Sequence, residues 1–591
     1  MKKYLFIAIA AFGLAACAEK MGNHHSGEVE NSFIAISLSA TDPNTRAEGV
    51  PYQEGAADER AVETAYFFFF NENGTAFPVN VNGSTIDGPG TEGALKNYLQ
   101  ASLTTTTGKD MNNVSDIKNV VLLLSNYKGE FPKKIVAVLN WVPSDDLYSL
   151  EALQKKLVNV RSNEDEDLKG KFVMSNSVYA ADGKAVYATP LTEDNIFTDE
   201  VNAKANPVTI YVERAAAKVT VTTAGGETKF NLNKPVVVGG DSTPVYAVIK
   251  GWELYNDYQT SHLVKNIDVS WTDTDLGFTW NDSPWFRCYW AKSQTGPFAG
   301  NTFNYEYASI PDGYKTVYGY GFGTEADVTA GTYAEKSFTY CGENTGRDAA
   351  SRTKVILKAQ LQKDNGDAVE LARWYTTEYL GEKDLRTAVA NTLKYTLYYE
   401  EEGTGNLIGI TPDDLQCVSP AYDGEGNITN GAPTDIKPYQ VFFQLSTDAQ
   451  NKKWYKNNAG VKQPITENVD SDPKGVAATN KHLSDQVEPA VLYKSGQTYY
   501  YIDIQHLGNL LDETVQTGEY GVVRNHIYAL NIKSIGGYGS PIYIGTSSIL
   551  NPEYPEYPGD DEETSFVSAE VRILSWRLVS HQVDVQPTPG V

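Results

Sequence analysis

Short segments in which apolar and polar residues alternate recur from one end of the chain to the other. In residues 32–40, Ile34, Ile36, Leu38 and Ala40 fall on one face and Ser37 and Ser39 on the other. A period of two is typical of a β-strand with one buried face. Residues 62–70 contain a run of phenylalanines, which predicts a strand buried on both faces. The pattern predicts an all-β chain built of β-sandwiches.

The length of 591 residues requires two or more domains, because one hydrophobic core does not grow to that size. The 38 Tyr favour pleated surfaces, and the 49 Gly and 26 Pro provide turns between short strands. We expect an N-terminal domain over residues 47–206, completed by a first strand in 32–46, and a C-terminal domain over residues 207–550. Further strands are predicted at residues 120–124, 135–142, 210–214, 218–221, 245–254, 354–361, 392–399 and 525–535, and a helix at residues 147–158.

The C-terminal end repeats the alternation of the first strand. Residues 551–563 are proline-rich and acidic and predict an extended linker. Aligning Phe33 with Phe566 places the apolar residues of 32–40 in phase with those of 564–574, and a slip of one residue would reverse the faces. The apolar residues here are Val567, Ala569, Val571 and Ile573, followed after a bend by Trp576 and Leu578. Such a strand can fold back on its own domain or reach a neighbouring molecule.

The first sixteen residues have the features of an export signal. Lys2 and Lys3 precede an apolar run over residues 4–14, which is too short to span a membrane. The run ends in Leu-Ala-Ala-Cys, which predicts peptidase cleavage before Cys17 and attachment of lipid to its thiol. Residues 17–31 would then be a lipidated tether. The alternative is an ordinary secretory signal with an incidental cysteine.

Charge and motif content argue against several other functions. A net charge of −26 argues against nucleic-acid binding, which needs clustered Lys and Arg. The sequence has no C-x-x-C, H-E-x-x-H or G-x-S-x-G motif, so we expect neither an enzyme nor a cofactor nor a metal site. Acidic residues at 163–167 and 273–275 lack the glycine and distal glutamate of a calcium loop. Cys288, Cys341 and Cys417 leave both a disulfide and free thiols open.

Several stretches together resemble one family. They are the lipidation motif at Cys17, residues 32–39 followed by Thr45-Arg46-Ala47, residues 212–215, residues 523–528, residues 532–535, and residues 566–585 with Trp576. In this order they resemble the major-subunit fimbrillins of the type V fimbriae of Bacteroidales-type bacteria, in particular the shaft subunit of the short (minor) fimbria. The chain departs from the family's usual end in residues 586–591.

The resemblance implies two transthyretin-like β-sandwich domains and a structural role. It implies a lipidated precursor at the cell outer membrane, which an Arg-specific protease cuts between Arg46 and Ala47. Arg60, in the same loop, is a second candidate for the cut. Cleavage would free the strand with Ile34, Ile36, Leu38 and Ala40, and the vacated groove would take residues 564–585 of another subunit.

The expected partners are copies of the same chain, accessory anchor and tip subunits, the protease, and host or bacterial surface receptors. The resulting extracellular fimbria would support adhesion and biofilm formation. Two alternatives remain: a surface lipoprotein that binds glycans through exposed aromatic residues, and an anchor or tip subunit of the fimbria.

Overall fold

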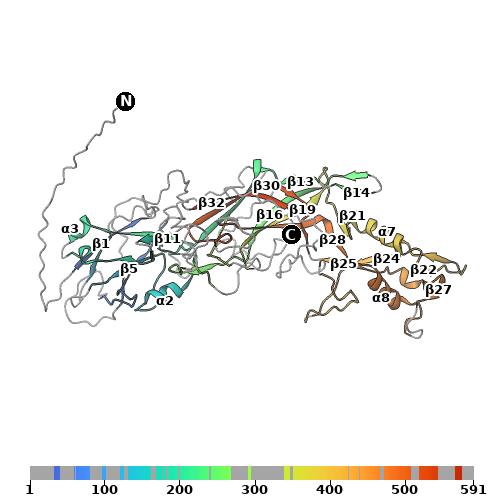
Figure 1. The fold of residues 1–591 in the computed structure, drawn as a ribbon, viewed down its shortest axis with the longest axis horizontal. Coiled ribbons are helices and arrows are strands. Elements are labelled where there is room, and N and C mark those ends of the chain that lie inside the picture. Colours follow the sequence, from blue (N-terminus) through green and yellow to red (C-terminus); the bar gives the residue numbers. More distant parts are fainter. Residues whose placement is uncertain are drawn as a thin grey trace, which may run out of the picture.

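The chain is an elongated all-β protein with a few short helices (Figure 1), as the sequence predicts. This computed structural model describes residues 32–39, 59–79, 96–100, 120–124, 131–160, 168–267, 291–294, 338–346, 351–465, 471–506, 518–542 and 566–575, apart from single residues or pairs within these ranges. Within the described ranges, no helix has the length and apolarity needed to cross a membrane. The predicted lipidated tether, the loop with Arg46 and the predicted linker at residues 551–563 lie outside the described residues.

The N-terminal part of the molecule is built around one sheet with the strand order β3-β2-β5-β7-β11-β1-β4, in which β10 also pairs with β5. Its strands are β1 (Ser32–Ser39), β2 (Ala65–Phe70), β3 (Tyr98–Gln100), β4 (Val120–Leu124), β5 (Lys134–Leu139), β7 (Met174–Asn176), β10 (Thr189–Pro190) and β11 (Val208–Arg214). The strand that opens the domain, β1, lies beside the strand that closes it, β11, and the two run parallel.

Strand β2 is buried on both of its faces, which confirms the prediction from its phenylalanines. Phe67 and Phe69 pack in one core cluster, whereas Phe68 and Phe70 pack in another with Tyr148. Helix α2 (Leu150–Lys155) covers the second cluster, and the hydroxyl of its N-cap residue Ser149 accepts a bond from the backbone N–H of Ala152. The predicted helix at 147–158 is correct only over these residues, since β6 (Leu157–Asn159) follows directly.

The C-terminal part is a sandwich of two sheets around one core. One sheet has the order β18-β12-β30-β32 and the other β13-β16-β19-β29-β31. The strands are β12 (Ala217–Thr223), β13 (Lys229–Asn231), β16 (Tyr246–Tyr255), β18 (Phe338–Cys341), β19 (Lys354–Gln362), β29 (Gln497–Asp503), β30 (His526–Gly536), β31 (Ser540–Pro541) and β32 (Phe566–Ser575). Because β11 belongs to the first sheet, the change of sheet falls at Ala215 and Ala216, later than the predicted boundary at 206.

A third core lies at the far end of the long axis, and nothing in the sequence pattern predicted it. It is formed by chain inserted between β19 and β29 (Figure 1). Its sheets are β21-β20-β28-β25-β24 and β23-β22-β26-β27, covered by helices α7 (Gly381–Leu393) and α8 (Val476–Gln486). The strands are β20 (Leu371–Trp374), β21 (Thr377–Leu380), β22 (Leu397–Glu400), β23 (Leu407–Gly409), β24 (Leu415–Val418), β25 (Gln440–Leu445), β26 (Trp454–Asn458), β27 (Val461–Pro464) and β28 (Ala490–Tyr493). We call this part the distal module.

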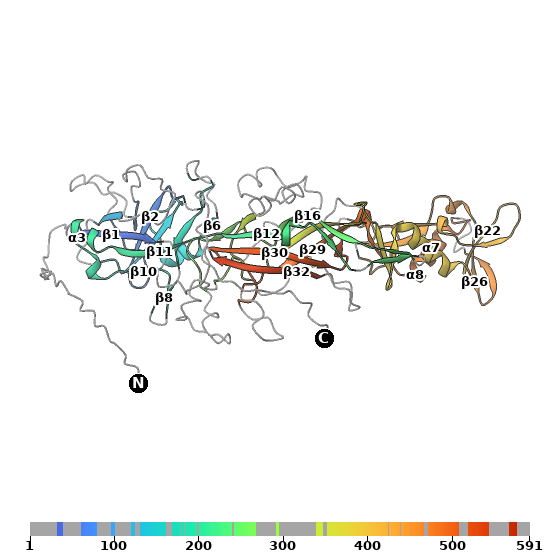
Figure 2. The same cartoon turned by 90° about the horizontal axis from the view of Figure 1, so that it is seen from above.

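The prediction of one strand over residues 392–399, which lie in the distal module, is wrong. Helix α7 continues to Leu393, because Leu385, Val389 and Leu393 lie one turn apart on its buried face, and only β22 is extended. Figure 2 shows the three parts in line, with the N-terminal sheet at one end, the sandwich with β30 and β32 in the middle, and α7 and α8 at the other end.

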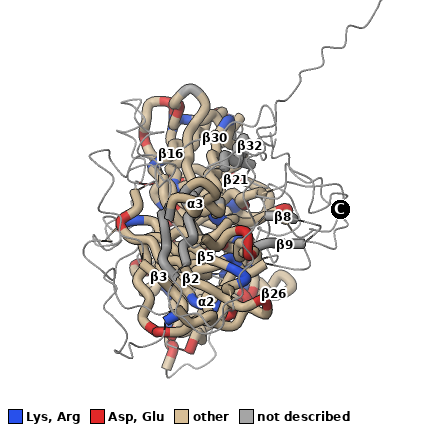
Figure 3. The backbone as a smooth tube through the Cα atoms, turned by 90° about the vertical axis from the view of Figure 1, so that its left-hand side faces the viewer, with Lys and Arg blue, Asp and Glu red and all other residues tan. Residues whose placement is uncertain are grey.

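The remaining elements are short. They are the helix α3 (Glu200–Ala205) and three two-stranded sheets: β6 with β17 (Thr260–His262), β8 (Tyr179–Ala181) with β9 (Lys184–Val186), and β14 (Val236–Val238) with β15 (Asp241–Thr243). Viewed from the N-terminal end, acidic and basic residues are scattered around the outline of the described chain (Figure 3).

Candidate assembly site

Strand β1 is an interior strand of its sheet and has a partner on each side. It runs parallel to β11, where Ile36 pairs with Val208 and Leu38 with Ile210, and antiparallel to β4, where Ile36 pairs with Val120. Val208 and Ile210 are buried core residues. Removal of β1 would therefore leave two unpaired strand edges and uncover part of the N-terminal core.

Strand β32, in contrast, is an edge strand with β30 as its ladder partner. The two strands are antiparallel, and the pairing runs from His526 opposite Ser575 to Gly536 opposite Phe566, with a bulge between Ile532 and Ser534. The positions on β30 opposite Ile573, Val571 and Ala569 are the buried core residues Tyr528, Leu530 and Ile532. In the single chain the C-terminal strand thus folds back on its own domain, which is one of the two arrangements that its sequence leaves open.

The same arrangement of strands occurs twice in the molecule. In β4-β1-β11-β7 and in β18-β12-β30-β32, the first strand of the domain runs parallel to a late one, and each of the two has an antiparallel neighbour on its other side. Strand β32 therefore occupies in the sandwich the place that β7 occupies in the N-terminal sheet. The two strands differ in that β7 also pairs with β5 on its other side, whereas β32 ends its sheet and follows the predicted linker at residues 551–563.

A buried acidic residue joins the start of β2 to the junction between the two sheets. Glu59 is 1% exposed, and its carboxylate lies 2.7 Å from the Nζ atom of Lys218 in β12 and accepts a hydrogen bond from the hydroxyl of Tyr340 in β18. Its carbonyl oxygen accepts a bond of 2.7 Å from Nε of Arg214, the last residue of β11. Arg214 also donates to the side-chain oxygen of Asn525, which precedes β30. We call these residues the Glu59 clamp.

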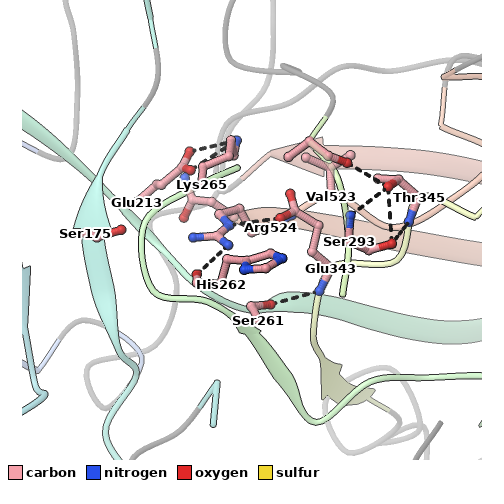
Figure 4. Close-up of polar contacts among 12 residues, drawn as sticks. Ser175, Glu213, Ser261, His262, Lys265, Ser293, Glu343, Thr345, Val523 and Arg524 are labelled. Atoms are coloured by element: carbon pink, nitrogen blue, oxygen red, sulfur yellow. Dashed lines mark hydrogen bonds and ion pairs between the residues drawn. The ribbon is translucent and has the colours of Figure 1, made fainter. Parts of the chain in front are cut away.

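Two further buried ion pairs lie at the same junction (Figure 4). Lys265 is 3.0 Å from Glu213 of β11, and Nε of Arg524 is 3.2 Å from Glu343, with all four side chains almost fully buried. Arg524 also donates to the carbonyl oxygen of His262, the last residue of β17. Since β17 pairs with β6 of the N-terminal part, charge pairs and a strand ladder both hold the two parts together.

Burial at the junction also changes the protonation of a histidine. His526 is 2% exposed, and its Nδ1 lies 2.7 Å from the carbonyl oxygen of Arg524, to which it donates. Loss of water around the ring lowers its pKa from 6.5 to about 4. His262, also screened from water and close to Arg524, has a lowered pKa as well. Both rings are therefore neutral at pH 7.

The described cysteines are protonated thiols without a disulfide. Burial raises the pKa of Cys341 well above its usual value and, with nearby Glu382, raises that of Cys417 to about 12. Within the described part of the chain, no group of three or more His, Cys, Asp or Glu residues is arranged to hold a metal ion.

Residues 491–582 match the family model described as "Major fimbrial subunit protein type IV, Fimbrillin, C-terminal". This stretch contains β29, β30 and β32, and thus the C-terminal strand and the strand with which it pairs. Over this stretch the chain is similar to the fimbrillins. The family resemblance inferred from short sequence stretches is confirmed.

Several solved structures are similar to most of the length of this chain at low sequence identity. A fimbrilin from Porphyromonas gingivalis is 13% identical, covers 93% of this chain and 98% of its own, and has a TM-score of 0.32. The tip fimbrial protein from the same organism is 11% identical, covers 92% of this chain and 100% of its own, and has a TM-score of 0.25. No curated protein matches the sequence. The assignment rests on the family model.

The predicted assembly residues fall partly within the described chain. Ile34, Ile36 and Leu38 lie in β1, and Val567, Ala569, Val571 and Ile573 lie in β32. The structure does not bring these two sets together, because β1 and β32 belong to different sheets. Outside the described residues lie Cys17, Ala40, Arg46, Ala47, Arg60, Cys288, Trp576, Leu578 and the 586–591 tail.

Sequence reasoning missed the Glu59 clamp and the other junction pairs. Residues 212–215 were recognised as part of a family pattern, yet nothing in them indicated that Glu213 and Arg214 would be buried. Glu59 is 159 residues from Lys218 and 281 from Tyr340 along the chain, so no local pattern records the contact.

Proposed function

We propose that this chain is the shaft subunit of a cell-surface fimbria. It is exported as a lipoprotein anchored through Cys17, activated by an Arg-specific protease that cuts after Arg46, and polymerised by strand exchange. In the exchange, the C-terminal strand of one subunit takes the place of β1 in the next. The lipidated precursor resides at the outer membrane, and the polymer is an extracellular fimbria that supports adhesion and biofilm formation.

The observation that carries the proposal is the position of β1. It is hydrogen-bonded on both sides, although it precedes the loop that holds the predicted cleavage position and is the first described segment of the chain. A cut after Arg46 would sever it from the remainder of the sheet. Loss of each backbone hydrogen bond destabilises the cleaved subunit by about 1 kcal/mol, and exposure of each apolar side chain of the core destabilises it by about 2 kcal/mol. The emptied groove therefore favours a replacement strand.

The number of neighbours favours exchange over the folded-back state. Among the described residues of its own chain, β32 pairs with one strand, β30. In the groove of another subunit it would pair with two, β4 and β11, and so would gain a second ladder of hydrogen bonds. Its alternation matches that of β1 in phase, so the same faces of the sheet would receive apolar residues.

The geometry of such an exchange produces a filament. The donated strand and the groove are different surfaces of the same subunit, so the contact is head-to-tail and does not close into a dimer. While β1 remains in place the groove is filled, and polymerisation waits for the protease. Anchor and tip subunits that share the groove or the strand would begin and end the filament.

The test is to treat the purified chain with trypsin, determine the new N-terminus by mass spectrometry, and examine assembly on SDS gels. We expect an N-terminus at Ala47 together with SDS-resistant ladders, and loss of the ladders when residues 565–591 are deleted. Deletion of residues 586–591 alone is the control and should leave the ladders intact. Ladders that persist without residues 565–591 would exclude the exchange.

A further inference from the structure

The loop between β1 and β2 contains a second arginine next to the Glu59 clamp. Arg60 directly follows Glu59, and an Arg-specific protease would accept either Arg60 or Arg46 by residue type. We infer that Glu59 is a positioning residue that protects the bond after Arg60 and so directs the activating cut to Arg46. This inference rests on the proposed proteolytic activation and adds a determinant of where the cut falls.

The described residues on either side of Arg60 are buried. Glu59 is 1% exposed, Ala61 3% and Val62 1%. A protease binds several residues on each side of the bond in an extended conformation, so it can act here only after this segment has opened locally. Ala61 is further held by its carbonyl oxygen, which accepts a bond of 2.8 Å from the side chain of the buried Asn140.

Local opening is opposed by contacts that come from several elements at once. To release Glu59, the chain must break the ion pair with Lys218 and the bonds from Tyr340 and Arg214, which belong to β12, β18 and β11. Lys218 would then remain at the junction without the carboxylate of Glu59. Separating a buried charge from its partner is strongly unfavourable, so the clamp keeps the segment closed.

A cut after Arg60 would also damage the subunit. Glu59 would leave with the N-terminal fragment, and β2 would begin four residues after a free chain end, whereas a cut after Arg46 leaves the clamp attached to β2. The clamp thus separates the part of the chain that is to be removed from the part that must stay folded.

The chain provides a matched control for this role. Glu63 forms an ion pair of 3.1 Å with Lys171, close to the clamp in sequence, but its side chain is 44% exposed. A surface pair of this kind contributes little to holding the segment closed. Glu63→Gln should therefore leave the pattern of cleavage unchanged, whereas Glu59→Ala should alter it.

The experiment is a time course of the purified full chain with an Arg-specific protease, in which mass spectrometry measures the termini at Ala47 and Ala61. We expect the natural chain to yield Ala47, and Glu59→Ala to increase the rate of appearance of Ala61 at least tenfold. Tyr340→Phe, which removes only a hydroxyl, should give a smaller increase without unfolding. The double variant Glu59→Ala/Arg60→Lys should abolish the new terminus.

The outcomes separate the clamp from the proposed function. Equal rates of cleavage at the two arginines in the natural chain, or an unchanged rate at Arg60 in both folded variants, would overturn the inference. Loss of cleavage at Arg46, or cleavage without SDS-resistant ladders, would contradict the proposed activation. The effect of Glu59→Ala on the rate of cleavage after Arg60 would still test the clamp separately.

Discussion

At the scale of single residues, the junction between the N-terminal sheet and the sandwich depends on charged side chains that the fold has taken out of water. Lys265 with Glu213 and Arg524 with Glu343 are buried ion pairs, and a side chain of this type is stabilising only while its partner is present. Such pairs fix one relative arrangement of the two parts more than they add stability. A single fixed arrangement is the property that the proposed shaft subunit would require along a filament.

Acidification should weaken the subunit through His526. Its pKa is about 4 in the folded protein and 6.5 in the unfolded chain, so its contribution is fully present above pH 6.5 and is lost as the pH falls toward 4. Between pH 7.5 and pH 5 we expect the free energy of unfolding to fall by about 2 kcal/mol through this residue.

The measurement is urea unfolding as a function of pH, followed by amide exchange of β30. His526→Asn keeps a donor for the carbonyl oxygen of Arg524 and removes the titrating ring. The variant should be less sensitive to pH over this range than the natural chain. Equal sensitivity in the two would show that other groups account for the loss.

At the scale of elements, the strand β32 should be required for assembly and dispensable for the fold of the monomer. Val571 is paired with Leu530, and β30 keeps its parallel partner β12 on the other side when β32 is absent. We therefore expect Val571→Asp to abolish SDS-resistant ladders while the protein remains monomeric and folded.

Ser568→Asp is the matched control, because residue 568 falls on the polar face of the alternation. It should assemble as the natural chain does. Circular dichroism and amide exchange of β12 and β16 report on the fold. If Val571→Asp unfolds the sandwich, β32 is a permanent part of its own domain.

The elements with a period of two were predictable from the sequence, whereas those stabilised by distant contacts were not. The strands β1, β4, β16, β19, β30 and β32 fall within a few residues of the predicted segments. The resting place of β32 was not predictable, since alternation sets which face is apolar and does not identify the neighbouring strand.

In the distal module, residue types alone predicted the wrong secondary structure. Residues 392–399 are rich in threonine and tyrosine, which favour strands, yet the helix α7 extends into them because Leu385, Val389 and Leu393 bury one stripe in the third core. The helical spacing was present in the sequence. The position of the insertion between two paired strands became evident only from the fold.

At the scale of the whole molecule, the distal module is placed away from both proposed assembly elements. It lies beyond the sandwich along the long axis, whereas β1 lies at the opposite end and β32 in the middle (Figure 2). It joins the sandwich through β19 and β29, which are neighbours, with Gln360 opposite Gln497. A two-residue turn can bridge such a pair of antiparallel strands.

Replacement of residues 361–496 by Asn-Gly should therefore give a shorter subunit that still polymerises. We expect a lower melting temperature, because Leu361, Leu371 and Tyr493 also belong to the sandwich core. Protease-treated protein should nevertheless form SDS-resistant ladders, and the same variant carrying Val571→Asp should form none. If the shortened protein folds, as judged by amide exchange of β16, and does not polymerise, the distal module contributes a contact between subunits that strand exchange alone does not supply.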